Sequence, residues 1–272
     1  MQSIENYRYD ILRDDQEKLV TFHKTDDLAP HENQHFHDSI EFIYVAKGCI
    51  HAKLGSDSLE ITNGHLLALP SFTPHDCPRK DVELWQLIVP RSMISNLDKL
   101  MERKTFASRV IRDPNGQLLS YLKLIHEINT REGIFSELDE DCAKNSAVTA
   151  AASFIRTVIP LFGLRDEIGS SSSVMQAIRY LSEHFREPLR IGEISQKLYC
   201  NRSQLSAHFR ETFGLSMNEY VTKLRAAEVR RLLSERSDIT LSEACVESGF
   251  GSLRTLHRAY KAIYGCAPHG RE

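Results

Sequence analysis

Near its C-terminal end, this 272-residue chain carries the same pattern of apolar residues twice, and that repeat limits the folds it can adopt. The first copy, "IGEISQKLYCNRSQLSAHFRETFG", predicts a short helix over about 191–198 and a second helix over about 202–212. Asn201 is a favourable N-cap for the second helix, and Gly214 ends it. This is the layout of a helix-turn-helix.

The second copy, "ITLSEACVESGFGSLRTLHRAYKAIYG", predicts helices over about 241–247 and 252–262 around a turn at Gly249. Between the copies, Met217–Glu235 has apolar residues on one broad face and reads as a single long helix. Such a helix spans about 28 Å, close to the roughly 34 Å between major-groove faces one turn apart. One chain could therefore place the second helix of each copy in successive major grooves.

The residues of both copies resemble the DNA-binding module of the AraC/XylS transcription regulators. Members of the family often carry an arginine at the position of Ala207, on the first recognition helix. Because this chain lacks that arginine, we expect its first recognition helix to read bases weakly. The matching residues are Leu205, Phe209, Gly214, Tyr220, Arg225, Leu232, Leu233, Ile239, Gly249, Phe250, Leu256, Arg258, Tyr260, Lys261, Gly265, Pro268 and Arg271.

Polar residues on the two recognition helices are the candidates for DNA contact. Arg254 shares a helix face with His257 and Arg258, and arginine can bond guanine O6 and N7 as a bidentate pair. Arg258 is equally suited to a phosphate, and the alternative for all of them is a solvated surface charge. The candidates are Arg202, Ser203, Gln204 and Ser206 on the first helix, and Arg254, His257 and Arg258 on the second.

Charge is divided unevenly along the chain. Up to Ser170 there are 19 Lys and Arg against 26 Asp and Glu, and beyond it 15 against 11, so only the C-terminal part is basic. The stretch "RDEIGSSSSV" between these parts predicts a linker. We therefore predict domains at 1–165 and 174–272, joined by a linker at 166–173.

The N-terminal part predicts short antiparallel strands separated by Gly, Pro, Asn and Asp. Their even spacing is typical of a β-barrel or sandwich. The strands are expected in "SIEFIYVAKG", "CIHAKLG", "DSLEIT", "HLLALP" and "VELWQLIV".

Three ionisable residues in "HFHDSIEF" have the same strand parity as apolar residues that follow. His35, His37 and Glu41 are thereby predicted on the inner face, where burial is costly without a partner. The spacing H-x-H-x3-E-x6-G, followed by Gly64, Pro70 and His75, resembles the two cupin motifs, although Phe72 stands where the second motif favours glycine.

The cupin resemblance implies that His35, His37, Glu41 and His75 converge inside the barrel. We expect them to line a polar pocket for a small organic effector, since regulators of this family use a cupin-like domain as sensor. A divalent transition metal held by the four residues, or a purely structural hydrogen-bonded cluster, are the alternatives.

Two apolar helical stripes follow the strands. Family resemblance implies that these helices pair two subunits into a homodimer, while the alternative is packing on their own barrel. The stripes are Leu118, Tyr121, Leu122, Ile125 and Ile128, then Ala143, Ala147, Ala151, Phe154, Ile155, Val158 and Ile159.

Together these features predict a multidomain α and β protein: an N-terminal antiparallel cupin-like β-barrel with helices, and a C-terminal all-α double helix-turn-helix. No long apolar run or signal peptide is present, and the six scattered cysteines read as reduced thiols in apolar surroundings, so we expect a cytoplasmic protein without a membrane partner.

The predicted function is a sequence-specific regulator that binds promoter DNA under the control of a small-molecule effector. The family favours an activator, which would act with RNA polymerase. The alternatives are a metal-dependent cupin enzyme and an effector-independent DNA-binding protein; the attached DNA-binding module argues against catalysis, so no catalytic residue is assigned.

Overall fold

We describe a computed structural model over residues 8–9, 20–24, 35–55, 57–78, 81–90, 101, 104–166 and 170–268. The chain divides into two compact units, with the boundary between Ile168 and Gly169. Strand β1 (Arg8–Tyr9) groups with the C-terminal unit. Arg271, part of the family match, and residues 167–169 of the predicted linker lie outside the described residues.

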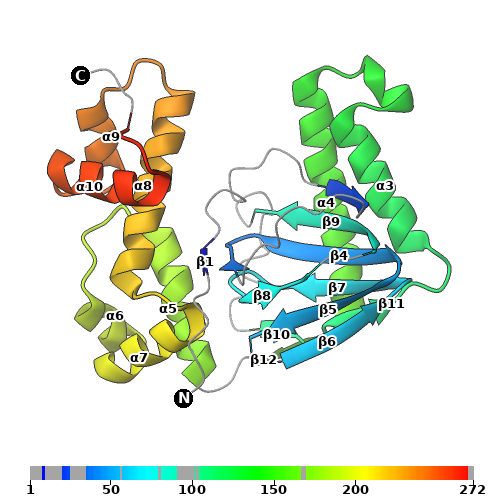
Figure 1. Cartoon of the computed structure of the whole chain (residues 1–272), viewed down its shortest axis with the longest axis horizontal. Helices are drawn as coiled ribbons and strands as arrows, with labels where there is room; N and C mark the ends of the chain where they lie inside the picture. The colour runs from blue at the N-terminus through cyan, green and yellow to red at the C-terminus, as the bar shows by residue number, and fades with distance from the viewer. Residues whose placement is uncertain are drawn as a thin grey trace. The chain divides into compact units, whose positions relative to one another are not determined.

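The N-terminal unit contains two antiparallel sheets and a short β-ribbon, most of whose strands are labelled in Figure 1. The five predicted strand segments all form strands. The first sheet has the order β11 (Val110–Arg112), β7 (His65–Leu69), β4 (Ile40–Lys47), β9 (Glu83–Val89) and β2 (Val20–Lys24). The second runs β3 (His35–Phe36), β8 (His75–Asp76), β5 (Cys49–Leu54) and β6 (Asp57–Thr62), and the ribbon pairs β10 (Lys104–Phe106) with β12 (Leu164–Asp166).

The two sheets share one apolar core. Ile43 and Val45 of β4 pack in the same cluster as Ile50 and Ala52 of β5 and Ile61 of β6. No ladder among the described strands joins the sheets into a closed barrel, so this unit is described as two packed sheets.

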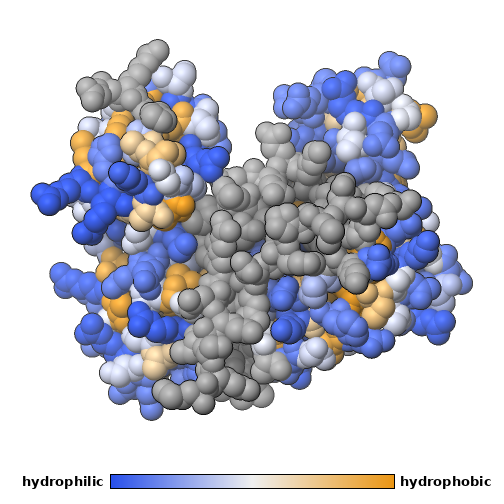
Figure 2. Space-filling view, viewed as in Figure 1, coloured by the Kyte–Doolittle hydropathy of each residue, from blue (hydrophilic) through white to orange (hydrophobic). Residues whose placement is uncertain are grey.

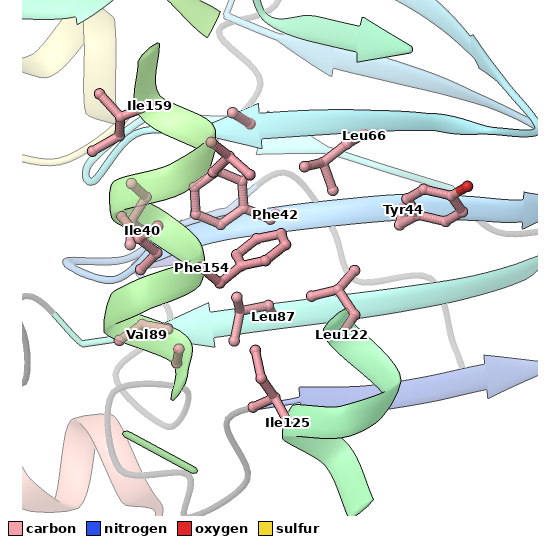
Figure 3. Packing of buried hydrophobic residues seen from close by; sticks show 14 of the residues in the cluster. Ile40, Phe42, Tyr44, Leu66, Leu87, Val89, Leu122, Ile125, Phe154 and Ile159 are labelled. Atoms are coloured by element: carbon pink, nitrogen blue, oxygen red, sulfur yellow. The ribbon is translucent and has the colours of Figure 1, made fainter. Parts of the chain in front are cut away.

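Strand β4 is buried on both faces, because helices cover the face turned away from this core. Helices α3 (Gln117–Thr130) and α4 (Glu140–Phe162), joined through the 3-10 helix η2 (Gly133–Glu137), pack there. Figure 3 shows Leu122 and Phe154 directed at Phe42 and Leu87. The two stripes expected to pair subunits are thus buried against their own sheet.

The C-terminal unit is all helical and follows the sequence pattern closely. Its long helix α8 occupies the predicted 217–235, and α10 begins one residue later than predicted because Ser252 is its N-cap. The helices are α5 (Ser170–His184), α6 (Ile191–Lys197), α7 (Arg202–Phe213), α8 (Met217–Glu235), α9 (Leu241–Glu247) and α10 (Leu253–Tyr264).

Two expectations need correction. Asp166 ends β12 and Ser170 begins α5, so most of the predicted linker belongs to regular elements; the apolar stripe from Val174 onward extends the helix back through the serines. Cys142 and Cys266 are exposed, not in apolar surroundings. No helix among the described residues has the length and apolarity of a membrane span.

Candidate functional site

The N-caps of α7 and α10 show which positions of the two recognition helices correspond. The Asn201 side chain accepts hydrogen bonds from Ser203 N and Gln204 N at 2.9 and 3.1 Å, and Ser252 caps α10 through Thr255 N at 3.3 Å. Counting from these caps, Ser203 corresponds to Arg254, Ser206 to His257, and Ala207 to Arg258. The buried residues agree with this register, since Leu205 matches Leu256 and Phe209 matches Tyr260.

The candidate DNA-contacting residues are accessible. Arg254, His257 and Arg258 are exposed, and none of the three has an ion pair or hydrogen bond within the described residues. Arg202, Ser203 and Gln204 are exposed too, and Ser206 is half-buried. Hydrophilic side chains predominate on the face of this unit seen in Figure 2. The cationic side chains therefore concentrate on α10, while α7 presents smaller polar groups.

Other arginines of this unit hold its helices together. Arg225 of α8 donates to the carbonyl oxygens of Phe185 and Glu187 just beyond α5, at 2.6 and 2.8 Å. Arg186 and Arg231 both donate to the buried carboxylate of Glu228, at 2.8 and 2.9 Å. Burial raises the pKa of Glu228, but these hydrogen bonds outweigh it and hold the pKa below its ordinary value. Sequence reasoning found Arg225 only as a family match and missed this structural role.

The N-terminal unit brings together the four residues of the predicted cluster. His35 pairs directly with His75 across β3 and β8, Glu41 lies on β4, and His37 lies in the bend between β3 and β4. Each is at most 5% exposed, and one ligand atom from each lies within 4.8 Å of all the others. The predicted continuous strand is interrupted at residues 37–39, so convergence arises between two sheets and not along one strand.

Backbone carbonyls fix the orientation of two of these imidazoles. His37 Nδ1 lies 3.0 Å from the Ser39 carbonyl oxygen, and His75 Nδ1 lies 2.8 Å from that of Thr73. A carbonyl oxygen can only accept, so each Nδ1 carries a hydrogen. Each Nε2 therefore faces the cluster, where both atoms lie beside the carboxylate of Glu41.

The carboxylate of Glu41 lies at the centre of this arrangement. Its Oε2 is 2.9 Å from His37 Nε2 and 3.3 Å from His75 Nε2, and Gln86 donates to its Oε1. Burial raises the pKa of Glu41, but hydrogen bonds and charges from His37 and His75 outweigh burial and hold the pKa well below its ordinary value. Sequence reasoning missed Gln86, which only strand pairing between β4 and β9 brings to the cluster.

This geometry requires something positive between the imidazoles and Glu41. With hydrogens on Nδ1, neutral histidines would point Nε2 lone pairs at a carboxylate oxygen, which is repulsive. A second proton on the rings or a metal cation removes the repulsion. Three imidazoles and one carboxylate, with the Nδ1 hydrogens of His37 and His75 held by carbonyls, are a donor set that fits a divalent transition metal.

The residue that departs from the cupin motif has an unusual backbone. Phe72 has φ of 62°, in the left-handed region where glycine is favoured, and it is fully buried. Its N–H donates to the His37 carbonyl oxygen at 2.8 Å. Burial of the ring offsets the backbone strain, so the turn that supports His37 is retained without glycine.

Comparison with known proteins gives matches to transcriptional regulators. A family described as "Helix-turn-helix domain" matches residues 194–270. The melibiose operon regulatory protein of Escherichia coli is 21% identical over 254 residues, covering 88% of this chain and 84% of that protein. The probable transcriptional regulator LumQ of Photobacterium leiognathi is 27% identical over 89 residues, 33% of this chain and only 36% of its own length.

Solved structures give weaker likenesses. ToxT from Vibrio cholerae has a TM-score of 0.47 at 12% identity, covering 92% of this chain and 94% of that one. The DNA-binding domain of AdpA in complex with a target DNA has a TM-score of 0.33 at 23% identity, covering 35% of this chain and 86% of that one.

Proposed function

We propose that this chain, which belongs to the AraC/XylS family of transcription regulators, binds promoter DNA through α7 and α10. Its affinity for that DNA changes when an effector binds at the buried histidine cluster. The observation that best supports this proposal is the pair of capped helix-turn-helix motifs joined by α8, with arginines on the second recognition helix that pair with none of the described residues. Arginine and histidine side chains without internal partners are available to bases and phosphates.

The two recognition helices contribute unequally to the recognition of DNA bases. Arg254 and Arg258 on α10 can contact guanine and the phosphates beside it. At the corresponding positions α7 carries Ser203 and Ala207, whose short side chains suit thymine methyl contacts and weak hydrogen bonds. We therefore assign most of the base specificity to the half-site contacted by α10.

In the N-terminal unit we assign the effector response to His35, His37, Glu41 and His75, and a divalent transition metal is the occupant that their tautomers favour. When bound, the metal would neutralise Glu41 and offer a Lewis-acid centre to a polar effector group. The protein's own contribution is to orient the imidazoles through Ser39 and Thr73 and to hold Glu41 with Gln86.

The family further favours an activator that works as a cytoplasmic homodimer with RNA polymerase, and not an enzyme. Because the apolar stripes of α3 and α4 are buried, a dimer contact in this unit would use their outer faces. Leu124 of α3 and Leu161 of α4 are exposed by 42% and 58%, and Ile134 of the intervening η2 is exposed by 84%.

The test of DNA binding uses the intact protein and DNA that it selects from a random pool. We expect the selected DNA to bind at least about 1,000-fold more tightly than a scrambled sequence at physiological salt. Equal affinity for both sequences would contradict sequence-specific binding and with it the proposed regulatory function.

The test of the effector centre compares tag-free protein with His37→Ala. We expect elemental analysis to find a divalent transition metal at this centre in the parent and its loss in the variant, together with a changed affinity for the selected DNA. Unchanged metal content and unchanged DNA affinity in His37→Ala would make the cluster purely structural.

A further inference from the structure

We propose a second metal site, independent of the buried cluster, on the outward face of the β5–β6 hairpin: Cys49, His51 and Glu60 bind a borderline-soft divalent cation of the zinc class. The three side chains each offer one ligand atom, and these atoms lie within 4.8 Å of one another. The proposal does not depend on the regulatory function proposed above.

Strand geometry brings the three ligands together. Along β5 the residues Ile50, Ala52 and Leu54 face the core, so Cys49 and His51 face outward. Glu60 of β6 is the direct cross-strand partner of His51, which places its carboxylate beside the imidazole. Because two ligands come from one strand and the third from its neighbour, no C-x-x-C or H-x-x-H spacing marks the site in the sequence.

The ligand types and spacing suit zinc. Thiolate, imidazole and carboxylate bind Zn²⁺ at about 2.0–2.3 Å, which puts tetrahedral ligand atoms about 3.3–3.8 Å apart. The observed limit of 4.8 Å requires only side-chain rotation to reach that spacing. Hard cations such as Mg²⁺ and Ca²⁺ are disfavoured, because they prefer all-oxygen ligands.

Exposure distinguishes this site from the buried cluster. His51 and Glu60 are exposed and Cys49 is half-buried, so an ion can enter and exchange directly with solvent. Three protein ligands leave a fourth position for water or another donor. A bound ion would also join the edge strand β6 to β5, and would stabilise the folded unit by mass action.

Cobalt provides a test that reports only on this site, since the buried cluster has no sulfur ligand. Tag-free intact protein carrying His37→Ala is titrated with Co²⁺, and the sulfur-to-cobalt charge-transfer band is recorded. We expect one equivalent to give the band, Zn²⁺ to abolish it by competition, and Cys49→Ser to lack it. The matched control is Cys142→Ser, an exposed cysteine outside the site, which should keep the band.

Substitution of the other two ligands completes the test. His51→Ala and Glu60→Gln change exposed side chains and should leave the circular dichroism spectrum intact. Each should weaken Co²⁺ binding by at least about 100-fold. Loss of a residue that only hydrogen-bonds to a metal ligand typically weakens metal binding by roughly 10–100-fold, so the loss of a ligand itself should cost at least as much. Absence of the band in the parent, its persistence in Cys49→Ser, or unchanged affinity in both other variants would overturn the proposal.

Discussion

The backbone of Gly249 passes so close to Arg186 that a Cβ atom on Gly249 would lie 2.4 Å from the Arg186 carbonyl oxygen. Gly249 also has φ of 83°, in the left-handed region. The turn of the second helix-turn-helix thus packs directly on the chain segment that follows α5. Both the position and the conformation exclude any side chain here.

We therefore expect Gly249→Ala to lower the free energy of unfolding by at least about 2 kcal/mol, through clash and backbone strain. The control is Tyr199→Gly in the corresponding turn of the first motif. Tyr199 has φ of 52° and is 98% exposed, so glycine relieves strain without loss of packing and should change stability by less than about 1 kcal/mol. Urea unfolding followed by circular dichroism compares them; similar losses in both variants would refute the packing argument.

The sequence predicted the C-terminal unit well because local signals agree there. Ser216 with Glu219, and Thr240 with Glu243, form capping boxes that fix where α8 and α9 begin, and Gly214 ends α7 in the left-handed conformation. Apolar periodicity then sets the helices between these signals. Local chemistry and tertiary packing specify the same boundaries.

The N-terminal site was predictable only in part. Its four ionisable residues follow from motif spacing, but the break at His37 and the approach of Gln86 depend on strand pairing between segments far apart in the chain. The pairing of Glu60 with His51 is equally non-local. The α3 and α4 stripes pack on the chain's own sheet, the alternative to subunit pairing, because apolar periodicity alone does not identify the surface that a stripe contacts.

Arg254→Ala tests direct base reading by α10. We expect it to weaken binding to the selected DNA by about 1–3 kcal/mol and to relax preference at one base position, with little effect on scrambled DNA. The matched variant Ser203→Ala, at the corresponding position of α7, should cost less. Fluorescence anisotropy over a salt series measures both; equal weakening on selected and scrambled DNA would instead mark Arg254 as a phosphate contact.

Glu228→Gln tests the ion-pair network between α8 and the end of α5. Because the folded pKa of Glu228 lies below the ordinary value of 4.5, its stabilisation is present above that pH and is lost as pH falls through the folded pKa. We expect the variant to be about 1–3 kcal/mol less stable at pH 7, with the difference shrinking below about pH 4. A difference that does not vary with pH would contradict the role given to the charge.

The boundary at Gly169 predicts a fragment that folds alone. Residues 169–272 should give a helical spectrum and bind the selected DNA more weakly than the intact protein if the N-terminal unit pairs two chains. In the intact protein Trp85 of β9, the single tryptophan, reports unfolding of the N-terminal unit separately. An unfolded fragment would show that the boundary is wrong.

A footprint of the intact protein on its selected DNA shows whether α7 and α10 contact two separate segments of DNA. We expect two protected major-groove segments about 10 base pairs apart. Arg254→Ala with Arg258→Ala should remove protection from one segment, while Ser203→Ala with Gln204→Ala should weaken only the other. A single protected segment, or loss of the same segment in both double variants, would contradict it.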